Sequence, residues 1–435
     1  MSGGIIFAAP KSGSGKTLIV AGLLRHLRRR GVSVASAKVG PDYIDPTFHS
    51  LAAGTPCVNL DPWAMRPTTL AGFIAEVERR AKIVLCEGVM GLFDGAGPDG
   101  EAGSTAELAR LTGWPVVLVV DANGQGGSVA ALVAGFARHD AQVPLAGLIL
   151  NRVASPRHHA LLSEAIARHV PDVPVLGAVS ADESMVLTTR HLGLVPAGEI
   201  RSIDALLERA ATRVGESCDI DRLLVLARPS GCTDKLGAPG LPPLGQRIAV
   251  ARDDAFLFAY EAALAGCRRL GAEISFFSPL ADTAPAADAD AVYLPGGYPE
   301  LHAAKLAAAT RFLASLSDGD RTIYGECGGY MVLGEALTDA DGKTHRMAGL
   351  LPLSTSFAER RRDLGYRSAR LLASGPLGAE GARFRGHEFH YATILEEKGN
   401  ALFSVADACG NELGRAGLRH GKVFGSFIHL VDSAD

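Results

Sequence analysis

The sequence predicts an α/β protein of two domains, in which a doubly wound parallel sheet is followed by a second α/β domain. Short apolar runs without polar alternation recur along the chain and alternate with segments of helical periodicity. This pattern is typical of strands that are buried on both faces of a sheet. A glycine-rich loop stands between the first strand and the first helix, and a segment dense in Pro and Gly separates the two α/β patterns.

The bulk properties exclude several classes of protein. The 435 residues are enough for two or three domains, and 47% apolar with 21% charged residues is ordinary for a globular chain. A net charge of -4 argues against a nucleic-acid partner, and no apolar run approaches the length of a membrane span. The seven cysteines are scattered without a CxxC pair, so we expect a cytoplasmic protein without disulfides or a zinc ribbon.

The first domain is expected over residues 1–227, where strands and helices alternate. In an open sheet of this kind, ligands lie beyond the carboxyl ends of the strands. The expected strands are Ile5–Ala9, Val34–Val39, Ile83–Cys86, Val116–Val120, Leu145–Leu150 and Val175–Val179, and the expected helices include Leu18–Leu27, Thr69–Arg80, Thr105–Leu111 and Val129–His139.

The loop between the first strand and the first helix has the form of a P-loop. Glycines let backbone N–H groups approach a phosphate, a lysine neutralises the outer phosphates, and a threonine hydroxyl can hold Mg²⁺. Pro10 replaces the usual first glycine, and a lysine near the loop start resembles the deviant Walker A ATPases. The loop therefore predicts ATP binding by Lys11, Gly13, Ser14, Gly15, Lys16 and Thr17.

Polar residues follow four other predicted strands, which predicts a single site at one edge of the sheet. Asp42 and Asp45 follow the second strand, Glu87 the third, Asp121 the fourth and Asn151 the fifth. Glu87 or Asp45 is expected to join Thr17 around Mg²⁺, because hard cations prefer carboxylate oxygens. Asn151 is expected to contact ATP.

The loop after the second strand and the loop after Glu87 supply candidate substrate contacts. These are Asp42, Tyr43, Asp45 and Asp94. Turn formation explains Asp42 and Asp94 nearly as well, because Asp favours turns wherever they occur.

Residues 228–246 are expected to be a linker and residues 247–435 a second domain. Its expected strands are Ile248–Ala251, Ile274–Phe277, Ala291–Leu294, Thr322–Tyr324 and Val423–Phe427, with helices around Ala259–Leu270 and up to about Leu316.

The segment Gly325–Gly329 reads GECGG between a strand and a helix, which is the form of a nucleophile elbow with cysteine in place of serine. At the start of a helix, the N-terminal dipole is expected to lower the pKa of the thiol. We therefore expect Cys327 to be a nucleophile. Gly328, together with Gly296 and Gly297 at a neighbouring strand end, is expected to supply N–H groups for an oxyanion.

A cysteine nucleophile needs a base. His429 follows a predicted strand and is our choice, while His387 and His390 stay open. His387 and His390 are three residues apart on a predicted strand, so they are not expected to share a metal.

With a P-loop and a cysteine elbow on one chain, the sequence resembles the cobyrinate and hydrogenobyrinate a,c-diamide synthase family of cobalamin biosynthesis. The resemblance spans almost the whole chain. It rests on Pro10–Thr17, Ala37–His49 (AKVGPDYIDPTFH), Cys86–Gly95 (CEGVMGLFDG), Leu294–Glu300 (LPGGYPE), Gly325–Gly334 (GECGGYMVLG) and Gly386–Tyr391 (GHEFHY).

The resemblance implies a dethiobiotin-synthetase-like ATP domain and a class I glutamine amidotransferase domain. Many class I domains carry a glutamate two residues after the histidine, but Val431 stands there, which leaves Asp432 or a backbone carbonyl to orient His429. The implied reaction amidates two corrin carboxylates through an acyl phosphate, with ammonia that Cys327 releases from glutamine. Lys38 and Arg190 are candidates for holding the anionic corrin, although each alone is better explained as an ordinary surface charge.

The sequence also leaves three other functions open. A nickel-sirohydrochlorin a,c-diamide synthase is the nearest alternative, followed by a switch ATPase with a deviant Walker A loop. A scaffold with two degenerate domains is the weakest. The expected partners are the small molecules ATP, glutamine and an anionic corrin, without nucleic acid or membrane, and a homodimer is a further expectation.

Overall fold

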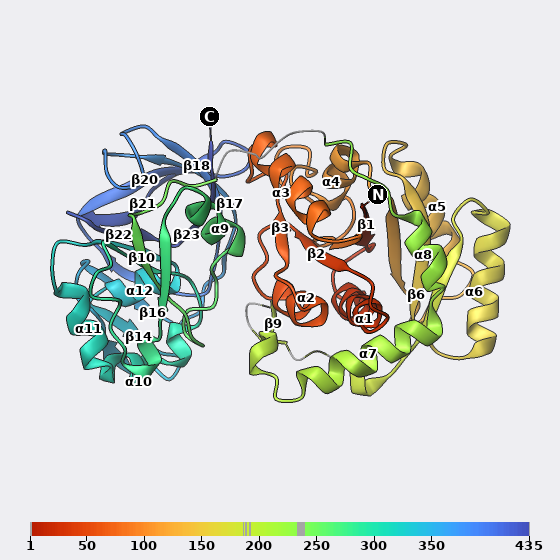
Figure 1. Cartoon of the computed structure of the whole chain (residues 1–435), viewed down its shortest axis with the longest axis horizontal. Helices are drawn as coiled ribbons and strands as arrows, with labels where there is room; N and C mark the ends of the chain where they lie inside the picture. Colours follow the sequence, from red (N-terminus) through yellow and green to blue (C-terminus); the bar gives the residue numbers. More distant parts are fainter. Residues whose placement is uncertain (1, 186, 188, 191–192, 233–239, 435) are drawn as a thin grey trace. The chain divides into compact units, whose positions relative to one another are not determined.

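A computed structural model describes residues 2–185, 187, 189–190, 193–232 and 240–434. The chain divides into two compact units (Figure 1). Unit 1 comprises Met1–Trp63 and Leu70–Ala238, and unit 2 comprises Ala64–Thr69 and Pro239–Asp435. No feature of the sequence predicted that the segment Ala64–Thr69 belongs to unit 2. Residues 233–239 of the expected linker lie outside the described part of the chain.

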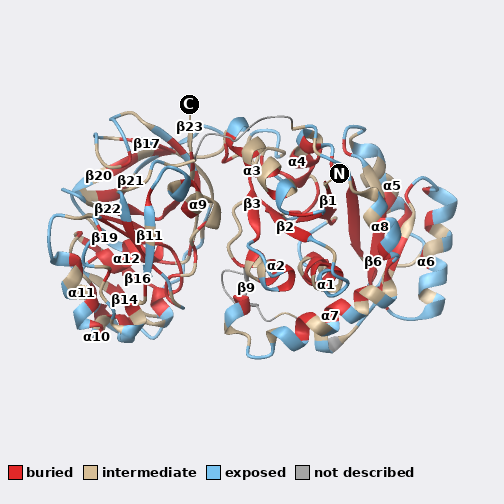
Figure 2. Cartoon of the chain, in the orientation of Figure 1, coloured by how far each residue is buried: buried red, intermediate tan, exposed pale blue. Residues whose placement is uncertain are grey.

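Unit 1 is built on a seven-stranded sheet in the order β3-β2-β4-β1-β5-β6-β7, and all neighbouring strands are parallel. Three adjacent strands, β2, β4 and β1, are buried along their whole length, as the absence of polar alternation predicts (Figure 2). The strands are β1 (Gly3–Ala8), β2 (Val34–Val39), β3 (Val58–Leu60), β4 (Ile83–Glu87), β5 (Val116–Asp121), β6 (Leu145–Val153) and β7 (Val175–Ser180).

Helices cover both faces of this sheet, with α1, α2 and α7 on one side and α3 and α4 on the other (Figure 1). The doubly wound fold is thereby confirmed. The two ends of α4 follow ordinary capping rules: the Ser104 hydroxyl accepts the Glu107 N–H at its start, and Gly113 ends it at φ 69°. The helices are α1 (Lys16–Arg29), α2 (Asp45–Ala53), α3 (Pro67–Arg80), α4 (Thr105–Thr112), α5 (Val129–His139), α6 (Pro156–His169), α7 (Ile203–Ser217) and α8 (Ile220–Leu226).

Unit 2 contains a ten-stranded sheet in the order β11-β10-β12-β13-β22-β21-β20-β17-β18-β23. The five strands from β11 to β22 are parallel, and the rest pair antiparallel. The strands are β10 (Arg247–Ala251), β11 (Glu273–Phe277), β12 (Ala291–Leu294), β13 (Thr322–Glu326), β17 (Asp363–Leu371), β18 (Arg383–His390), β20 (Asn400–Ala406), β21 (Glu412–His420), β22 (Val423–Ser426) and β23 (Ile428–Ala434).

Among its described residues, unit 2 also contains a smaller sheet of four strands, in the order β15-β14-β16-β19, and the helices α9 to α12. The single helix expected up to Leu316 is two helices, which meet at Ala309. The elements are β14 (Ala336–Thr338), β15 (Thr344–Arg346), β16 (Leu353–Ser356), β19 (Thr393–Glu397), α9 (Glu261–Arg269), α10 (Ala303–Ala308), α11 (Thr310–Ser317) and α12 (Gly328–Leu333).

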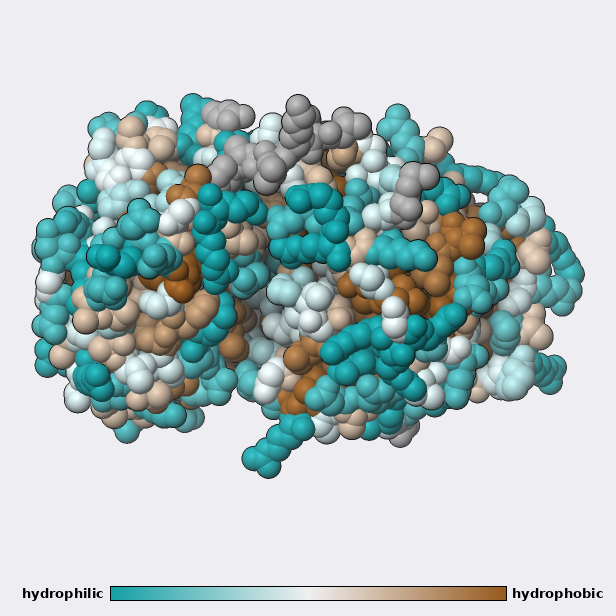
Figure 3. Space-filling model, viewed as in Figure 1, coloured by the Kyte–Doolittle hydropathy of each residue, from teal (hydrophilic) through white to brown (hydrophobic). Residues whose placement is uncertain are grey.

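Among the described residues, no helix has the length and apolar character that crossing a membrane requires. The visible face of each unit mixes hydrophilic and hydrophobic side chains (Figure 3).

Candidate functional sites

The phosphate loop of unit 1 leads from the end of β1 into α1 and has the backbone of an anion-binding turn. Gly13 and Gly15 have φ of 78° and 90°, a region that residues with a side chain rarely adopt. A Cβ on Gly15 would lie 2.2 Å from the amide nitrogen of Asn151. That amide donates to the Ser14 carbonyl at 2.9 Å. Asn151, expected to contact ATP, therefore lies directly against the loop.

Two side chains of the loop point toward the end of β4. The Lys16 ammonium donates to the Met90 carbonyl at 2.6 Å, and the Thr17 hydroxyl donates to Glu87 Oε1 at 2.8 Å. Burial lowers the pKa of Lys16, although Glu87 opposes this shift. The structure thus brings Lys16, Thr17 and Glu87 together, as the adjacent strands β1 and β4 require.

Lys38, at the end of β2, holds a cluster of three carboxylates. Its Nζ lies 2.8 Å from Asp45, 3.5 Å from Glu87 and 3.7 Å from Asp42. Burial alone would lower the pKa of Lys38, but the surrounding carboxylates raise it. Lys38 is only 3% exposed, so its interpretation as a surface charge is wrong.

The pKa values of two carboxyl groups in this cluster shift in opposite directions. Burial would raise the pKa of Glu87, but Lys38 and a hydrogen bond from His49 lower it to about 2. Burial and the nearby Asp42 raise the pKa of Asp45. Glu87 is therefore the group that stays ionised near Thr17.

Sequence reasoning missed two residues that support this cluster. His49 Nε2 lies 2.6 Å from Glu87 Oε2, and both side chains are buried. The Asn59 amide donates to the carbonyls of Gly40 and Asp42 at 2.9 and 2.7 Å, which holds the loop after β2. His49 lies within the quoted segment Ala37–His49, but no spacing rule connects it to Glu87.

The candidate substrate residues have mainly local contacts. Asp42 accepts the backbone N–H groups of Ile44 and Asp45, and Asp94 accepts that of Gly91, which are turn-forming bonds. Tyr43 is half-buried in the loop after β2. Their role as substrate contacts stays a prediction. The side chain of Arg190 lies outside the described residues.

A third residue beside the loop was also missed. Arg152, with φ of 57°, donates to the Gly13 carbonyl at 3.0 Å and to Asp121 at 2.6 Å. Asp121 at the end of β5 is thus connected to the phosphate loop through Arg152. Lys11 is exposed at the start of the loop.

The oxygen donors at the loop fit Mg²⁺ in part. Thr17 and Glu87 offer a hydroxyl and an ionised carboxylate within 2.8 Å of each other, and Mg²⁺ commonly takes one or two carboxylates plus phosphate and water. The Asp45 carboxylate contacts the Lys38 ammonium instead. Among the described residues, no group of three His, Cys, Asp or Glu side chains could hold a metal alone. Asp45 as a ligand stays a prediction.

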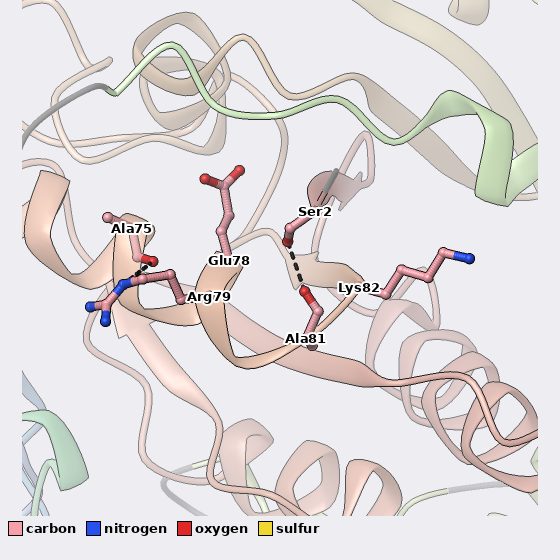
Figure 4. Close-up of a pocket in the computed structure, with 6 residues that line it drawn as sticks. All are labelled: Ser2, Ala75, Glu78, Arg79, Ala81 and Lys82. Carbon is pink, nitrogen blue, oxygen red and sulfur yellow. Dashed lines mark hydrogen bonds between the residues drawn. The ribbon is translucent and has the colours of Figure 1, made fainter.

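A shallow depression elsewhere on unit 1 is not a candidate site (Figure 4). It lies at the amino ends of β1 and β4, opposite the phosphate loop. The Ser2 hydroxyl donates to the Ala81 carbonyl there, and Glu78 accepts bonds from Trp114 and Ser230. These polar groups already have partners within the protein.

In unit 2, Cys327 lies on a strained turn between β13 and α12. Its φ of 47° and ψ of −100° are unusual for a residue with a side chain. The turn requires glycine nearby, because a Cβ on Gly329 would lie 1.9 Å from the Leu294 carbonyl oxygen. The Cys327 N–H donates to the Ser426 carbonyl at the end of β22. This is the nucleophile-elbow geometry that the sequence predicts.

The pKa of the Cys327 thiol is raised, and not lowered as we expected from its place at a helix start. Burial raises the pKa of the thiol, and the charge of Glu300 raises it further, while the Gly328 N–H only partly opposes this. The helix after the turn, α12, has only six residues. A short helix offers a small dipole, so the loss of solvation dominates.

The three glycines predicted to stabilise an oxyanion lie at the elbow. A Cβ on Gly328 would lie 3.0 Å from the Gly297 nitrogen, and a Cβ on Gly296 would lie 2.4 Å from His429 Cε1. The loop after β12 therefore contacts both the turn after Cys327 and the imidazole of His429. Its use as an oxyanion site stays a prediction.

The three candidate histidines, His387, His390 and His429, are buried close to one another. His387 and His429 stack with ring centroids 4.8 Å apart, and Tyr260 Oη lies 2.7 Å from His387 Nε2. His390 lies 3.1 Å from Glu388 and stacks on Phe427. Burial, with the nearby His387 and His390, lowers the pKa of His429, so its imidazole is neutral, as a base must be.

Asp432, an open candidate for orienting His429, binds another residue. Arg66, in the segment Ala64–Thr69, donates to both carboxylate oxygens of Asp432 from its backbone N–H and its guanidinium. Asp432 is fully buried in this pair. The expectation that Asp432 orients His429 therefore has no support in the geometry.

Comparisons with known proteins match both units. A model described as the CobQ/CobB/MinD/ParA nucleotide binding domain matches residues 5–192, and a model described as the CobB/CobQ-like glutamine amidotransferase domain matches residues 247–435. The chain thus combines a nucleotide-binding domain with a glutamine amidotransferase domain.

Curated relatives match along the whole chain. The hydrogenobyrinate a,c-diamide synthase of Rhizobium meliloti (strain 1021) is 52% identical over 99% of this chain and 100% of its own length. That of Brucella abortus biovar 1 is 54% identical over 99% of this chain and 98% of its own length. At this identity and coverage, the chain belongs to the hydrogenobyrinate a,c-diamide synthase family.

Proposed function

We propose that this enzyme amidates the a and c carboxylates of hydrogenobyrinate, with ATP as the activating substrate and glutamine as the nitrogen donor. The observation that carries the proposal is the identity of 52–54% to named hydrogenobyrinate a,c-diamide synthases across the full chain. The two candidate sites supply residues for both halves of such a reaction.

In the first half, a carboxylate oxygen of the acceptor attacks the γ-phosphorus of ATP, which forms an acyl phosphate and releases ADP. Lys16 and the N–H groups of the phosphate loop bind the phosphates and stabilise the charge that develops on them. Thr17 and Glu87 would hold Mg²⁺, which neutralises phosphate charge when bound. Ammonia then attacks the acyl carbon, and inorganic phosphate leaves.

In the second half, Cys327 opens glutamine. The thiol passes its proton to His429, and the sulfur attacks the side-chain amide carbon while N–H groups from the Gly296–Gly297 loop and Gly328 stabilise the oxyanion. The C–N bond breaks, and His429 gives its proton to the departing ammonia. Water then hydrolyses the glutamyl thioester to glutamate and restores the thiol.

Incubation with defined acceptors tests the proposal. The protein is mixed with ATP, Mg²⁺, glutamine and one of hydrogenobyrinate, cobyrinate or nickel-sirohydrochlorin, and the products are read by mass spectrometry. We expect two successive exchanges of carboxyl OH for NH₂ on hydrogenobyrinate, and none with a Lys16→Ala variant. Amidation of nickel-sirohydrochlorin alone would favour the nearest alternative.

A switch ATPase has one observation in its favour, the exposed Lys11 at the loop start. ATP hydrolysis without any glutaminase activity would support it. A cytoplasmic location and a homodimer stay predictions from the sequence.

A further inference from the structure

Directly before the nucleophile, at the end of β13, lies a carboxylate that the proposed reaction has not used. Glu326 is 2% exposed. Its Oε2 accepts the Tyr293 hydroxyl at 2.6 Å, and its Oε1 accepts the Tyr324 hydroxyl at 2.8 Å and the Leu430 N–H at 3.1 Å. Three donors from β12, β13 and β23 thus hold the carboxylate in one orientation.

The same carboxylate faces the proposed base. His429 Nδ1 lies 3.8 Å from Glu326 Oε2, and both side chains are buried. On its face, the ring of His429 stacks on His387 with an angle of 6° between the planes. Tyr260 in turn holds His387. Stacking on His387 therefore fixes the plane of the His429 ring, and Glu326 lies beside its Nδ1 atom.

We propose that Glu326 is the positioning residue of His429, so that the orienting carboxylate of this amidotransferase domain precedes the nucleophile instead of following the histidine. The inference rests on the proposed roles of Cys327 and His429. In this arrangement Nδ1–H points at the carboxylate, which leaves Nε2 to take the Cys327 proton and deliver it to ammonia. Glu326 accepts a hydrogen bond and does not take the proton itself.

Two observations favour Glu326 over Asp432. Asp432 is two residues further along β23 than Leu430 and is bound to Arg66 on both oxygens. Glu326 Oε2, by contrast, is the carboxylate atom paired with His429 Nδ1. A separation of 3.8 Å exceeds a hydrogen bond, and such contacts often shorten only when substrate is bound.

The electrostatic surroundings make the pair sensitive to pH. Burial raises the pKa of Glu326 to about 7, although its three donors partly oppose this. Around the two side chains, the titratable groups are Tyr293, Tyr324, Cys327, His387, His390 and Glu388. When His429 gains a proton, the ionised carboxylate stabilises the imidazolium, so loss of the carboxylate should lower the pKa of His429.

The test uses the full chain and the isosteric variant Glu326→Gln. We expect glutaminase kcat/KM to fall by about 10²-fold or more, with the acid limb of its pH profile moved to lower pH. Alkylation of Cys327 by iodoacetamide should need a higher pH, because the thiolate–imidazolium pair is less stable. Synthesis from ammonium should persist, which shows that the fold is intact. Tyr324→Phe is the matched control: it removes one donor to the same carboxylate and should change the glutaminase rate only a few-fold.

Unchanged pH profiles for both glutaminase and alkylation in Glu326→Gln would overturn the inference. The inference would also be overturned if the variant lost both glutaminase activity and ammonium-dependent synthesis while its alkylation profile stayed unchanged. If the variant does not fold, ¹⁵N chemical shifts of histidine in the wild-type protein decide: Nδ1–H on His429 supports the inference, and Nε2–H overturns it. Glutaminase activity in Cys327→Ala would instead overturn the proposed function beneath it.

Discussion

Replacement of Gly296 by alanine is expected to displace the imidazole of His429 without unfolding unit 2. The added Cβ would lie 2.4 Å from His429 Cε1 and 3.3 Å from the Phe258 Cβ. Ordinary carbon–carbon contacts begin near 3.5 Å, so the ring must move by about 1 Å. The φ of Gly296 is outside the left-handed region, so the backbone itself accepts alanine.

A misplacement of about 1 Å in a catalytic group can cost about 10²-fold in rate. We therefore expect glutamine-dependent synthesis by Gly296→Ala to fall by about 10²-fold in kcat, while synthesis from ammonium is retained. The matched control is Gly266→Ala in α9, where a Cβ would meet only the Arg269 guanidinium at 3.9 Å. That control should be fully active and slightly more stable, because alanine favours a helix over glycine by up to about 1 kcal/mol.

Full glutamine-dependent activity in Gly296→Ala would contradict this expectation. Such a result would mean that the ring of His429 can move by this distance without effect, or that another residue is the base.

Two further predictions concern the phosphate loop. Lys16→Ala should abolish synthesis from glutamine and from ammonium alike, because the acyl phosphate precedes both; normal product formation by this variant would contradict the ATP-site assignment. Glu87 has a pKa lowered to about 2 from an ordinary 4.5, so its ionised form stabilises unit 1 above about pH 4.5, and this contribution is lost as the pH falls toward 2. Thermal unfolding of Glu87→Gln should therefore depend less on pH in this range than that of the wild type, and equal pH dependence would contradict the assignment.

Local motifs made much of the fold and of the candidate sites predictable. The P-loop and the cysteine elbow are each one continuous stretch of sequence, and the glycines of each stretch indicate its backbone geometry. The strand ends could be grouped because neighbouring parallel strands end at one edge of a sheet, which is where Glu87 and Asn151 lie.

Contacts between distant residues were not predictable from one sequence. Arg66 and Asp432 are separated by 366 positions, and no motif marks either residue. The sequence shows that Lys38 carries a charge, but its burial among three carboxylates depends on the strand order β2-β4-β1. Glu326 occupies a variable position of the elbow pattern, so only the packing of Tyr293 and Tyr324 reveals it.

Antiparallel strands of unit 2 such as β17 and β21 were missed for a different reason. Strand β17 mixes buried, intermediate and exposed positions, and β21 is exposed over its first half. Half-exposed strands with Arg and Gly carry a weak hydrophobic signal, unlike the continuously buried strands β1, β2 and β4 of unit 1.

In the proposed reaction, unit 1 carries out the ATP-dependent step and Cys327 of unit 2 releases ammonia from glutamine. The most direct test compares wild type and Cys327→Ala with hydrogenobyrinate, ATP and Mg²⁺, supplied with glutamine or with ammonium at mildly alkaline pH. We predict that Cys327→Ala makes no diamide from glutamine but makes it from ammonium at close to the wild-type rate. Diamide formation from glutamine, or loss of both activities in a folded variant, would contradict the claim.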